Sequence, residues 1–254
     1  WHQTKQGALT ISTKHFVVNN QDLSLDGALD LLFKKGSVSP SLNLLAGFYV
    51  RSPQRVPTYL PVSIISPGAV RWLDQAFIGG KPMTGKVIIR GNMAHFPFDK
   101  GRGVFSVEAK INDLDLHYAK GWPALKHLVG SLFFDGRSMI VKSTSATLGK
   151  MSVDGIRAVI PEMGHKIPLI LRVDSYFHSG AKALLDVLKS SPMDHTLGPT
   201  LSALTMQGKT KTHLRLQIPL HKNGQAKVLG TTHFFQSTLG VPAWGVELNQ
   251  LNGD

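Results

Sequence analysis

The chain contains no cysteine. Disulfides, thiolate metal ligands and cysteine nucleophiles are therefore excluded. Its 11 histidines are scattered, without a His-Glu-x-x-His motif or a close His–carboxylate pair at ligand spacing. Asp113 and Asp115 point to one side of an expected strand and could hold a cation, but a solvated strand edge explains them better. We predict no metal ion and no cofactor.

Acidic residues are also scarce, since 16 Asp and Glu face 28 Lys and Arg, for a formal net charge of +12. This balance favours contact with phosphate, in nucleic acid or in lipid headgroups, although an inert basic surface would look the same. Aromatic residues make up only 8% of the chain and mostly occupy apolar strand positions, such as Phe105, Phe133 and Phe234. Nucleic-acid binding needs exposed aromatics among basic residues, so we predict no nucleic-acid partner.

Long hydrophobic runs are missing, and none approaches the roughly 20 residues of a membrane-spanning helix. The first residues, "WHQTKQGALTIS", are polar and strand-like and do not resemble a signal peptide. The chain starts without Met and stops at "LNQLNGD", within another strand-like stretch. We therefore expect an interior piece of a longer protein, and the missing targeting segments carry little weight.

Alternation of apolar and polar residues is the dominant pattern. In "KTKTHLRLQIPL" (209–220), Thr and apolar residues fall on one side of a strand and mostly basic residues on the other. The same pattern covers 103–118, with a change of phase at Asn112–Asp113 that predicts a bulge. Similar segments fill most of the chain, with turns expected at 135–136 and 148–150. The sequence therefore predicts a mainly β fold.

Two short helices interrupt the strands. "SPGAVRWLDQAFIGG" has Ser66 as a possible cap, Pro67 at the first helical position and Gly79 as a stop. "SGAKALLDVLKSSP" has Ser179 as a possible cap and is blocked by Pro192. A sheet with one apolar face must cover that face, and two helices of about three turns are little cover for the dozen strands expected here.

A possible internal repeat has a period of 123 residues. "PMTGK" (82–86) and "TMQGK" (205–209) share Met, Gly and Lys, and "LKHLVG" (125–130) and "LNQLNG" (248–253) share Leu, Leu and Gly. Both offsets agree, because 206 − 83 = 123 and 253 − 130 = 123. We expect one continuous segment over 1–254 with tandem units at about 60–180 and 181–254, the second incomplete. A unit this long favours an elongated sheet over a compact barrel.

Motifs for catalysis are incomplete. Ser179-Gly180-Ala181-Lys182 fits Ser-x-x-Lys, but the partner motifs of serine acyl-enzymes are missing. Gly208-Lys209-Thr210 resembles the end of a phosphate-binding loop, but Ala203 replaces the required glycine and a strand follows where a helix is needed. No acid–base pair can be argued from spacing. We predict that the chain is not an enzyme.

One ordered set of short motifs resembles the YhdP branch of the AsmA-like proteins. The resemblance covers nearly all of the chain and is densest from 58 to 230. The matching features are Tyr59-Leu60-Pro61, Trp72-Leu73-Asp74, Gly85, Gly91, Phe96-Pro97-Phe98, Gly103-x-Phe105, Tyr118-x-x-Gly121-Trp122-Pro123, Leu128-x-Gly130-x-Leu132-x-Phe134, and the stretches "LLDVLKSSPMDHTLG", "MQGKTKTHLRLQIPL" and "VLGTTHFF".

The resemblance implies a function that composition could not indicate. Members of this family are large envelope proteins of Gram-negative bacteria that are anchored in the inner membrane by an N-terminal helix and extend through the periplasm. Their long, strongly bent antiparallel sheet forms an apolar groove, in which they are thought to carry phospholipid toward the outer membrane and so support its barrier. The resemblance implies no catalytic residue, and it places the anchor outside this chain.

On this basis we expect the acyl chains of phospholipid to lie against the apolar side of the strands. The candidate groove residues are Phe105, Val107, Ala109, Ile111, Leu214, Leu216, Ile218 and Leu220. Any of them could instead pack against another part of the sheet or a helix. A periplasmic scaffold that docks a protein partner through its apolar face is the alternative function. An enzyme on a β scaffold is a third possibility, for which the sequence contains no support.

Overall fold

The computed structural model describes residues 2–3, 8–59, 67–163, 169–220 and 224–254. In the described residues, fourteen strands form a single antiparallel sheet. The strands are β1 (His2–Gln3), β2 (Leu9–Asn19), β3 (Leu23–Phe33), β4 (Ser41–Val50), β5 (Phe77–Gly80), β6 (Met83–Asn92), β7 (Gly103–Leu116), β8 (Leu125–Asp135), β9 (Ser138–Leu148), β10 (Met151–Ile160), β11 (Ile170–Gly180), β12 (Thr205–Pro219), β13 (Lys227–Val241) and β14 (Val246–Gly253).

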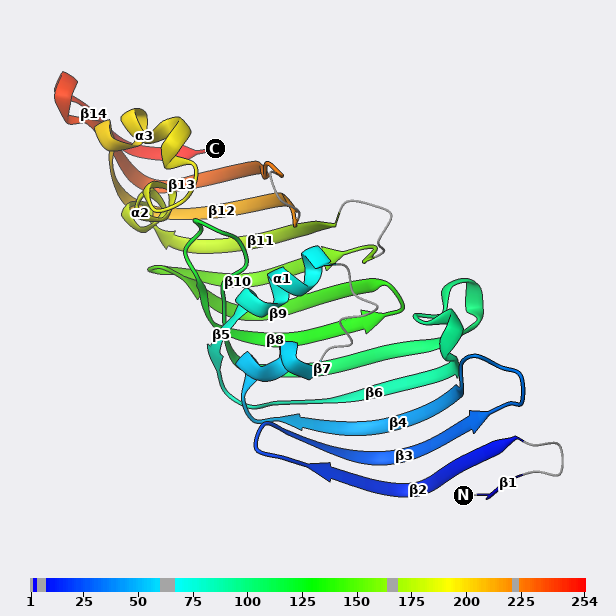
Figure 1. The fold of residues 1–254 in the computed structure, drawn as a ribbon. Coiled ribbons are helices and arrows are strands. Elements are labelled where there is room, and N and C mark those ends of the chain that lie inside the picture. Colours follow the sequence, from blue (N-terminus) through cyan, green and yellow to red (C-terminus); the bar gives the residue numbers. More distant parts are fainter. Residues whose placement is uncertain (1, 4–7, 60–66, 164–168, 221–223) are drawn as a thin grey trace.

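The strand order follows the sequence, β1 to β14, with one exception. The short strand β5 is not in the main row and pairs with the end of β7. Each strand of the main row therefore lies beside its neighbour in the sequence, through tight turns such as β8–β9 and β9–β10 or through longer connections that contain the helices. The sheet is elongated and bent, and the first and last strands lie at its opposite ends (Figure 1). The predicted antiparallel, mainly β fold is confirmed.

Cross-strand register places the apolar side chains of successive strands on the same side of the sheet. Val107 of β7, for example, lies opposite Val87 of β6 and Phe134 of β8. Because paired residues in an antiparallel ladder point the same way, the alternation of each strand adds to that of the next. We call this apolar side the inner face and the opposite side the outer face.

Irregular ladder positions occur where the sequence changes phase. The β7–β8 register shifts between Ile111 and Leu114, which confirms the bulge predicted at Asn112–Asp113. The shift keeps Leu114 and Leu116 on the inner face although the spacing has changed by one residue. The turns predicted at 135–136 and 148–150 also form, between β8 and β9 and between β9 and β10.

The helices differ from the prediction in number and in their ends. The described helices are α1 (Pro67–Ala76), α2 (Ala181–Lys189), α3 (Asp194–Ala203) and the 3-10 turns η1 (Pro53–Tyr59), η2 (Met93–His95), η3 (Asp99–Gly101) and η4 (Pro242–Trp244). The helix α3 was not predicted, because Pro199 and Gly198 are helix-breaking residues by propensity. The first helix ends at Ala76 rather than at Gly79, since the following residues form β5.

The cap predicted at Ser179 is wrong. Gly180 precedes the first turn of α2, and no side chain caps it. The Ser179 hydroxyl lies 3.0 Å from the Thr210 hydroxyl of the neighbouring strand, so it bridges β11 and β12 instead. The predicted cap Ser66 lies outside the described residues.

Candidate functional site

The inner face is an almost continuous apolar surface from β2 to β12. Glycine and a few hydroxyl side chains are the main interruptions, such as Gly85, Gly130, Ser143 and Ser175. Its larger apolar members, strand by strand, are Ile11, Phe16, Val18, Leu23, Leu25, Leu29, Leu31, Phe33, Leu42, Leu44, Phe48, Val87, Ile89, Phe105, Val107, Ile111, Leu114, Leu116, Leu125, Leu128, Leu132, Phe134, Met139, Val141, Leu148, Val153, Ile156, Ile160, Leu171, Val173, Phe177, Leu214, Leu216 and Ile218.

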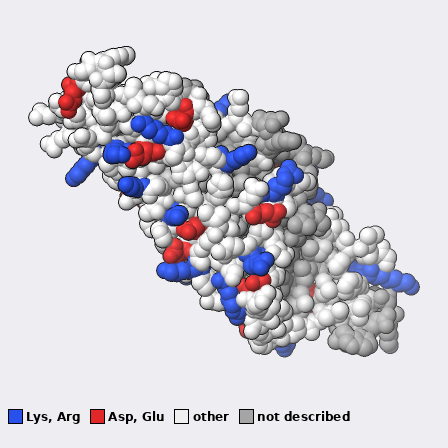
Figure 2. Space-filling view, turned by 60° about the vertical axis from the view of Figure 1, so that its left-hand side comes forward, with Lys and Arg blue, Asp and Glu red and all other residues white. Residues whose placement is uncertain are grey.

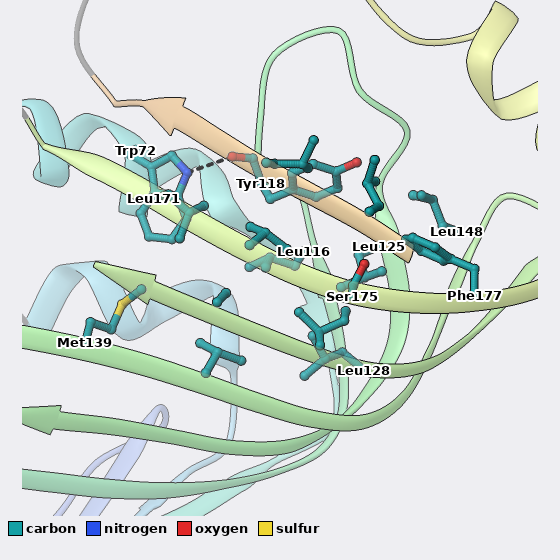
Figure 3. A pocket seen from close by; sticks show the side chains of 16 residues that line it. Trp72, Leu116, Tyr118, Leu125, Leu128, Met139, Leu148, Leu171, Ser175 and Phe177 are labelled. Atoms are coloured by element: carbon teal, nitrogen blue, oxygen red, sulfur yellow. Dashed lines mark hydrogen bonds between the residues drawn. The ribbon is translucent and has the colours of Figure 1, made fainter. Parts of the chain in front are cut away.

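A cavity of about 70 Å³ lies on the inner face of β7–β12. Sixteen residues line it, and Figure 3 shows their side chains converging from these strands, from α1 and from the segment after β7. The polar groups among the lining side chains are the Ser175 hydroxyl, the Tyr118 phenol and the Trp72 indole N–H. All other lining side chains consist of hydrocarbon or, for Met139, also contain sulfur. Such a surface offers contact to hydrocarbon and few hydrogen bonds to a polar ligand.

The helix α1 covers this cavity from the side opposite the sheet. The Trp72 indole N–H donates a hydrogen bond of 2.9 Å to the backbone carbonyl of Tyr118, in the connection between β7 and β8 (Figure 3). Leu73 and Ala76 of the same helix are buried. Burial raises the pKa of the Tyr118 phenol well above its ordinary value, so the ring stays neutral beside the cavity. The bond fastens α1 to this connection.

Loss of the indole hydrogen bond should loosen α1. Trp72→Phe keeps an aromatic ring over the cavity but leaves the Tyr118 carbonyl without its partner, at a cost of about 1–3 kcal/mol. We expect the amides of α1 to exchange with deuterium at least about fivefold faster, because local opening depends on the same free energy. Arg71→Ala, on the exposed side of α1, is the matched control. Equal exchange in the two variants would contradict this role of Trp72.

Two further elements cover the inner face near one end of its strands. Leu184 and Val187 of α2 belong to a buried cluster with Leu148, Val153 and Phe177, and Val56 of η1 packs against that cluster. A second buried cluster joins Trp122 to the inner-face residues of β9–β12. The middle of the inner face is therefore packed against protein, with the cavity left between the layers.

Toward β2 the inner face is more open. Ile11, Val18 and Phe33 are 41%, 49% and 40% exposed. All three side chains lie on the inner face. Exposed apolar side chains on such a face are typical of surfaces where another molecule binds.

The eight candidate groove residues all carry their side chains on the inner face or at its margin. Leu214 and Leu216 line the cavity, and Ile218 and Leu220 pack in the cluster of Trp122. Ile111 lies in the cluster of α2, and Ala109 is 3% exposed. Phe105 and Val107 lie further along β7, where Phe105 contacts Phe96 and Phe134. Protein already covers Ala109, Ile111, Leu216 and Ile218, so in this structure their neighbours are other side chains.

Sequence reasoning missed the residues that cover the cavity. Trp72 and Tyr118 are named from the sequence only within motifs of the resemblance, and the same holds for Trp122, which packs beside the cavity. A tryptophan in an amphipathic helix and aromatics in a Gly- and Pro-containing connection are the signals that could have indicated a cover over the sheet.

Of the acidic pair at the β7 bulge, Asp113 contacts basic side chains, and Asp115 accepts a hydrogen bond from the His127 backbone N–H. Asp113, Asp115 and His127 could together offer three ligand atoms to a cation. The Lys81 ammonium lies 3.2 Å from Asp113, and His127 Nδ1 lies 3.2 Å from the other oxygen of this carboxylate. The bond from Lys81 holds the pKa of Asp113 below its ordinary value. Asp113 thus has a cationic partner supplied by the chain itself.

The outer face carries charges of both signs. Figure 2 shows Lys and Arg close to Asp and Glu over much of the face drawn. His213, on β12, lies 3.1 Å from Asp174 and stacks on Tyr176. His178 likewise pairs with Asp154. The outer face therefore carries hydrogen-bonded polar and charged side chains, with exposed apolar residues such as Val17 and Leu45 among them.

Comparison with known proteins gives the family. The family model described as YhdP protein matches residues 1–254. The chain belongs to the YhdP family. A relative in this family is the intermembrane phospholipid transporter YhdP of Escherichia coli (strain K12), which is 27% identical over 228 residues. The matched region is 85% of this chain but only 18% of that YhdP protein.

No solved structure matches this chain. None of the helices in the described part of the chain has the length and hydropathy needed to cross a membrane.

Proposed function

We propose that this chain is a segment of an envelope lipid transporter whose inner face shields phospholipid acyl chains between the inner and outer membranes. It acts without catalysis and without a cofactor. In this proposal it lies in the periplasm as part of an inner-membrane-anchored protein of a Gram-negative bacterium, and its work supports the outer-membrane barrier. The name of the E. coli relative, an intermembrane phospholipid transporter, supports the ligand class.

The observation that carries the proposal is the continuity of the apolar inner face across strand after strand. Each methylene buried against such a surface contributes roughly 0.8 kcal/mol, so a long acyl chain is held even when few contacts are specific. A path for lipid needs weak and repeated binding, because tight binding at one place would stop the movement of the lipid along the sheet. An apolar face without directional polar groups meets that requirement.

A protein scaffold is the second candidate. The covered middle of the inner face, where α1, α2 and the β7–β8 connection pack on the strands, favours it, because a filled layer holds no acyl chain. In that case the exposed residues near β2 would dock a partner protein. The cavity beneath α1 and the open inner face near β2 favour lipid instead.

Gently purified protein should carry phospholipid that mass spectrometry of the intact complex detects. Val18→Asp places a carboxylate on the open inner face and should reduce the bound lipid at least about tenfold, because a buried unpaired charge costs several kcal/mol. Val17→Asp is the matched control, since Val17 is 59% exposed and points to the outer face of the same strand. Absence of lipid from the wild-type protein, with a bound protein partner in its place, would support the scaffold.

A further inference from the structure

The helix α1 crosses the inner face from β7 to the end of β12. At its C-terminal end, the Ala76 carbonyl accepts a hydrogen bond of 2.8 Å from the backbone N–H of His117, and β5, which follows at once, pairs with β7. At its N-terminal end, Gly68 lies against the residue that follows β12, because a Cβ added to Gly68 would be 3.0 Å from the backbone oxygen of Leu220. The cavity of β7–β12 lies beneath the helix.

One side chain holds α1 to the strands beneath it. Among the side chains that the structure describes, Trp72 is the single residue of α1 that packs in the two buried clusters of the inner face. The helix α2, by comparison, contributes four side chains to these clusters, Leu184 and Val187 among them. The strand pairing of β5 fixes the C-terminal end of α1. The N-terminal end can therefore move away from the sheet when Trp72 leaves its place.

The position of α1 closes this part of the inner face to lipid. The cavity beneath it has a volume of about 70 Å³. An engineered cavity that binds benzene, with six carbon atoms, measures about 150 Å³. An acyl chain has more carbon atoms than benzene, so the cavity holds none while α1 is in place. The apolar inner face nevertheless continues from Val107 through the cavity lining to Leu216.

We propose that α1 is a hinged cover on the lipid path, and that Trp72 controls whether an acyl chain reaches the inner face of β7–β12. Displacement of the N-terminal end of α1 breaks the bond from Trp72 to Tyr118 and uncovers the cavity lining, which includes Leu171 and Leu216 (Figure 3). The acyl chain replaces the indole over these side chains, and α1 returns when the lipid has moved on. Trp72 is thus a positioning residue for the cover.

The chemistry of the lining makes the opening depend on lipid. Without lipid, an open α1 leaves the hydrocarbon of the lining in water, which the hydrophobic effect opposes. With an acyl chain in place of the indole, the lining stays covered by hydrocarbon, so lipid shifts the equilibrium toward the open position. The open inner face toward β2 binds lipid in either position of α1. This inference rests on the proposed lipid path and adds a point at which passage is controlled.

The absence of cysteine from the chain allows α1 to be linked to the sheet selectively. In Gly68→Cys/Leu220→Cys, a short bifunctional methanethiosulfonate reagent joins the N-terminal end of α1 to the end of β12, and a reductant releases it. The purified protein is mixed with phosphatidylcholine vesicles whose acyl chains carry bromine, which quenches tryptophan on contact. Trp122 packs beside the cavity and reports lipid under α1, and its signal is isolated by difference with Trp122→Phe in each variant.

The link should slow the quenching of Trp122 at least about tenfold, and the reductant should restore the rate, because lipid enters only when α1 opens. Trp72→Phe without the link should speed the quenching at least about fivefold, since it removes the bond that holds the cover closed. Arg71→Ala, on the exposed side of α1, and the two single-cysteine variants treated with the reagent are the controls and should match the wild type.

Equal quenching rates in the linked and the released protein overturn the proposal, because lipid would then reach Trp122 without displacement of α1. Quenching in neither form, with phospholipid detected by mass spectrometry of the intact complex, also overturns it, but leaves the proposed lipid path in place on the open inner face. The absence of both quenching and bound phospholipid contradicts the path, and the cover with it.

Discussion

Ile89→Asp should weaken binding of a fluorescent phospholipid at least about tenfold, because several kcal/mol of charge desolvation oppose an acyl chain passing that point. Ile89 lies on the inner face of β6, between Leu44 of β4 and Phe105 of β7. The side chain is only partly buried, so the substitution changes the surface more than the packing. A fluorescence titration with the purified protein measures the effect.

The adjacent residue supplies the control for this prediction. Ile88 is 38% exposed on the outer face of the same strand, so Ile88→Asp adds the same charge on the opposite side of the sheet. The affinity of the Ile88→Asp variant for the fluorescent phospholipid should stay within about twofold of the wild-type affinity. Equal weakening by the two substitutions would show that net charge, and not the inner face, governs binding.

Leu128→Ala should lower the free energy of unfolding by about 2–5 kcal/mol, because it removes buried methyl groups and enlarges an existing cavity. Leu128 is 1% exposed, belongs to the cluster that joins β7–β9 to α2, and lines the cavity. Urea denaturation followed by circular dichroism measures the change. A loss of this size would show that the layer over the middle strands stabilises the fold.

Val129→Ala is the matched control for this substitution. Val129 is the next residue and is 37% exposed, so its truncation should cost no more than about 0.5 kcal/mol. If Leu128→Ala were as mild as Val129→Ala, the inner face at β8 would be loosely covered, and the middle of the sheet would be open to lipid without movement of α1.

Strand alternation predicted the larger part of the fold. Period-2 segments identified the strands, and the change of phase at Asn112–Asp113 located a bulge that the β7–β8 register confirms. The face of each candidate groove residue followed from the same alternation, because successive side chains in a strand point to opposite sides. Sequential pairing follows where the connections are short, whereas the β4–β6 and β11–β12 connections contain the helices.

The cover of the inner face could not be predicted in the same way. The contact between Trp72 and the carbonyl of Tyr118 joins residues 46 positions apart, and no local pattern specifies such a contact. The helix α3 contains a glycine and a proline that local propensity counts against it, and tertiary packing overrides that preference. For this reason the alternation of β12 identified the apolar side of Leu216 but not the protein that buries it.

Site-specific photo-crosslinking at two neighbouring positions of β4 is the most direct test of the lipid path. A photoreactive amino acid replaces either Leu44, on the inner face, or Leu45, which is 56% exposed on the outer face. After irradiation in cells, mass spectrometry identifies what each position contacts. We predict phospholipid adducts at position 44 and none at position 45. Protein adducts alone at position 44, or equal lipid adducts at both positions, would contradict the account.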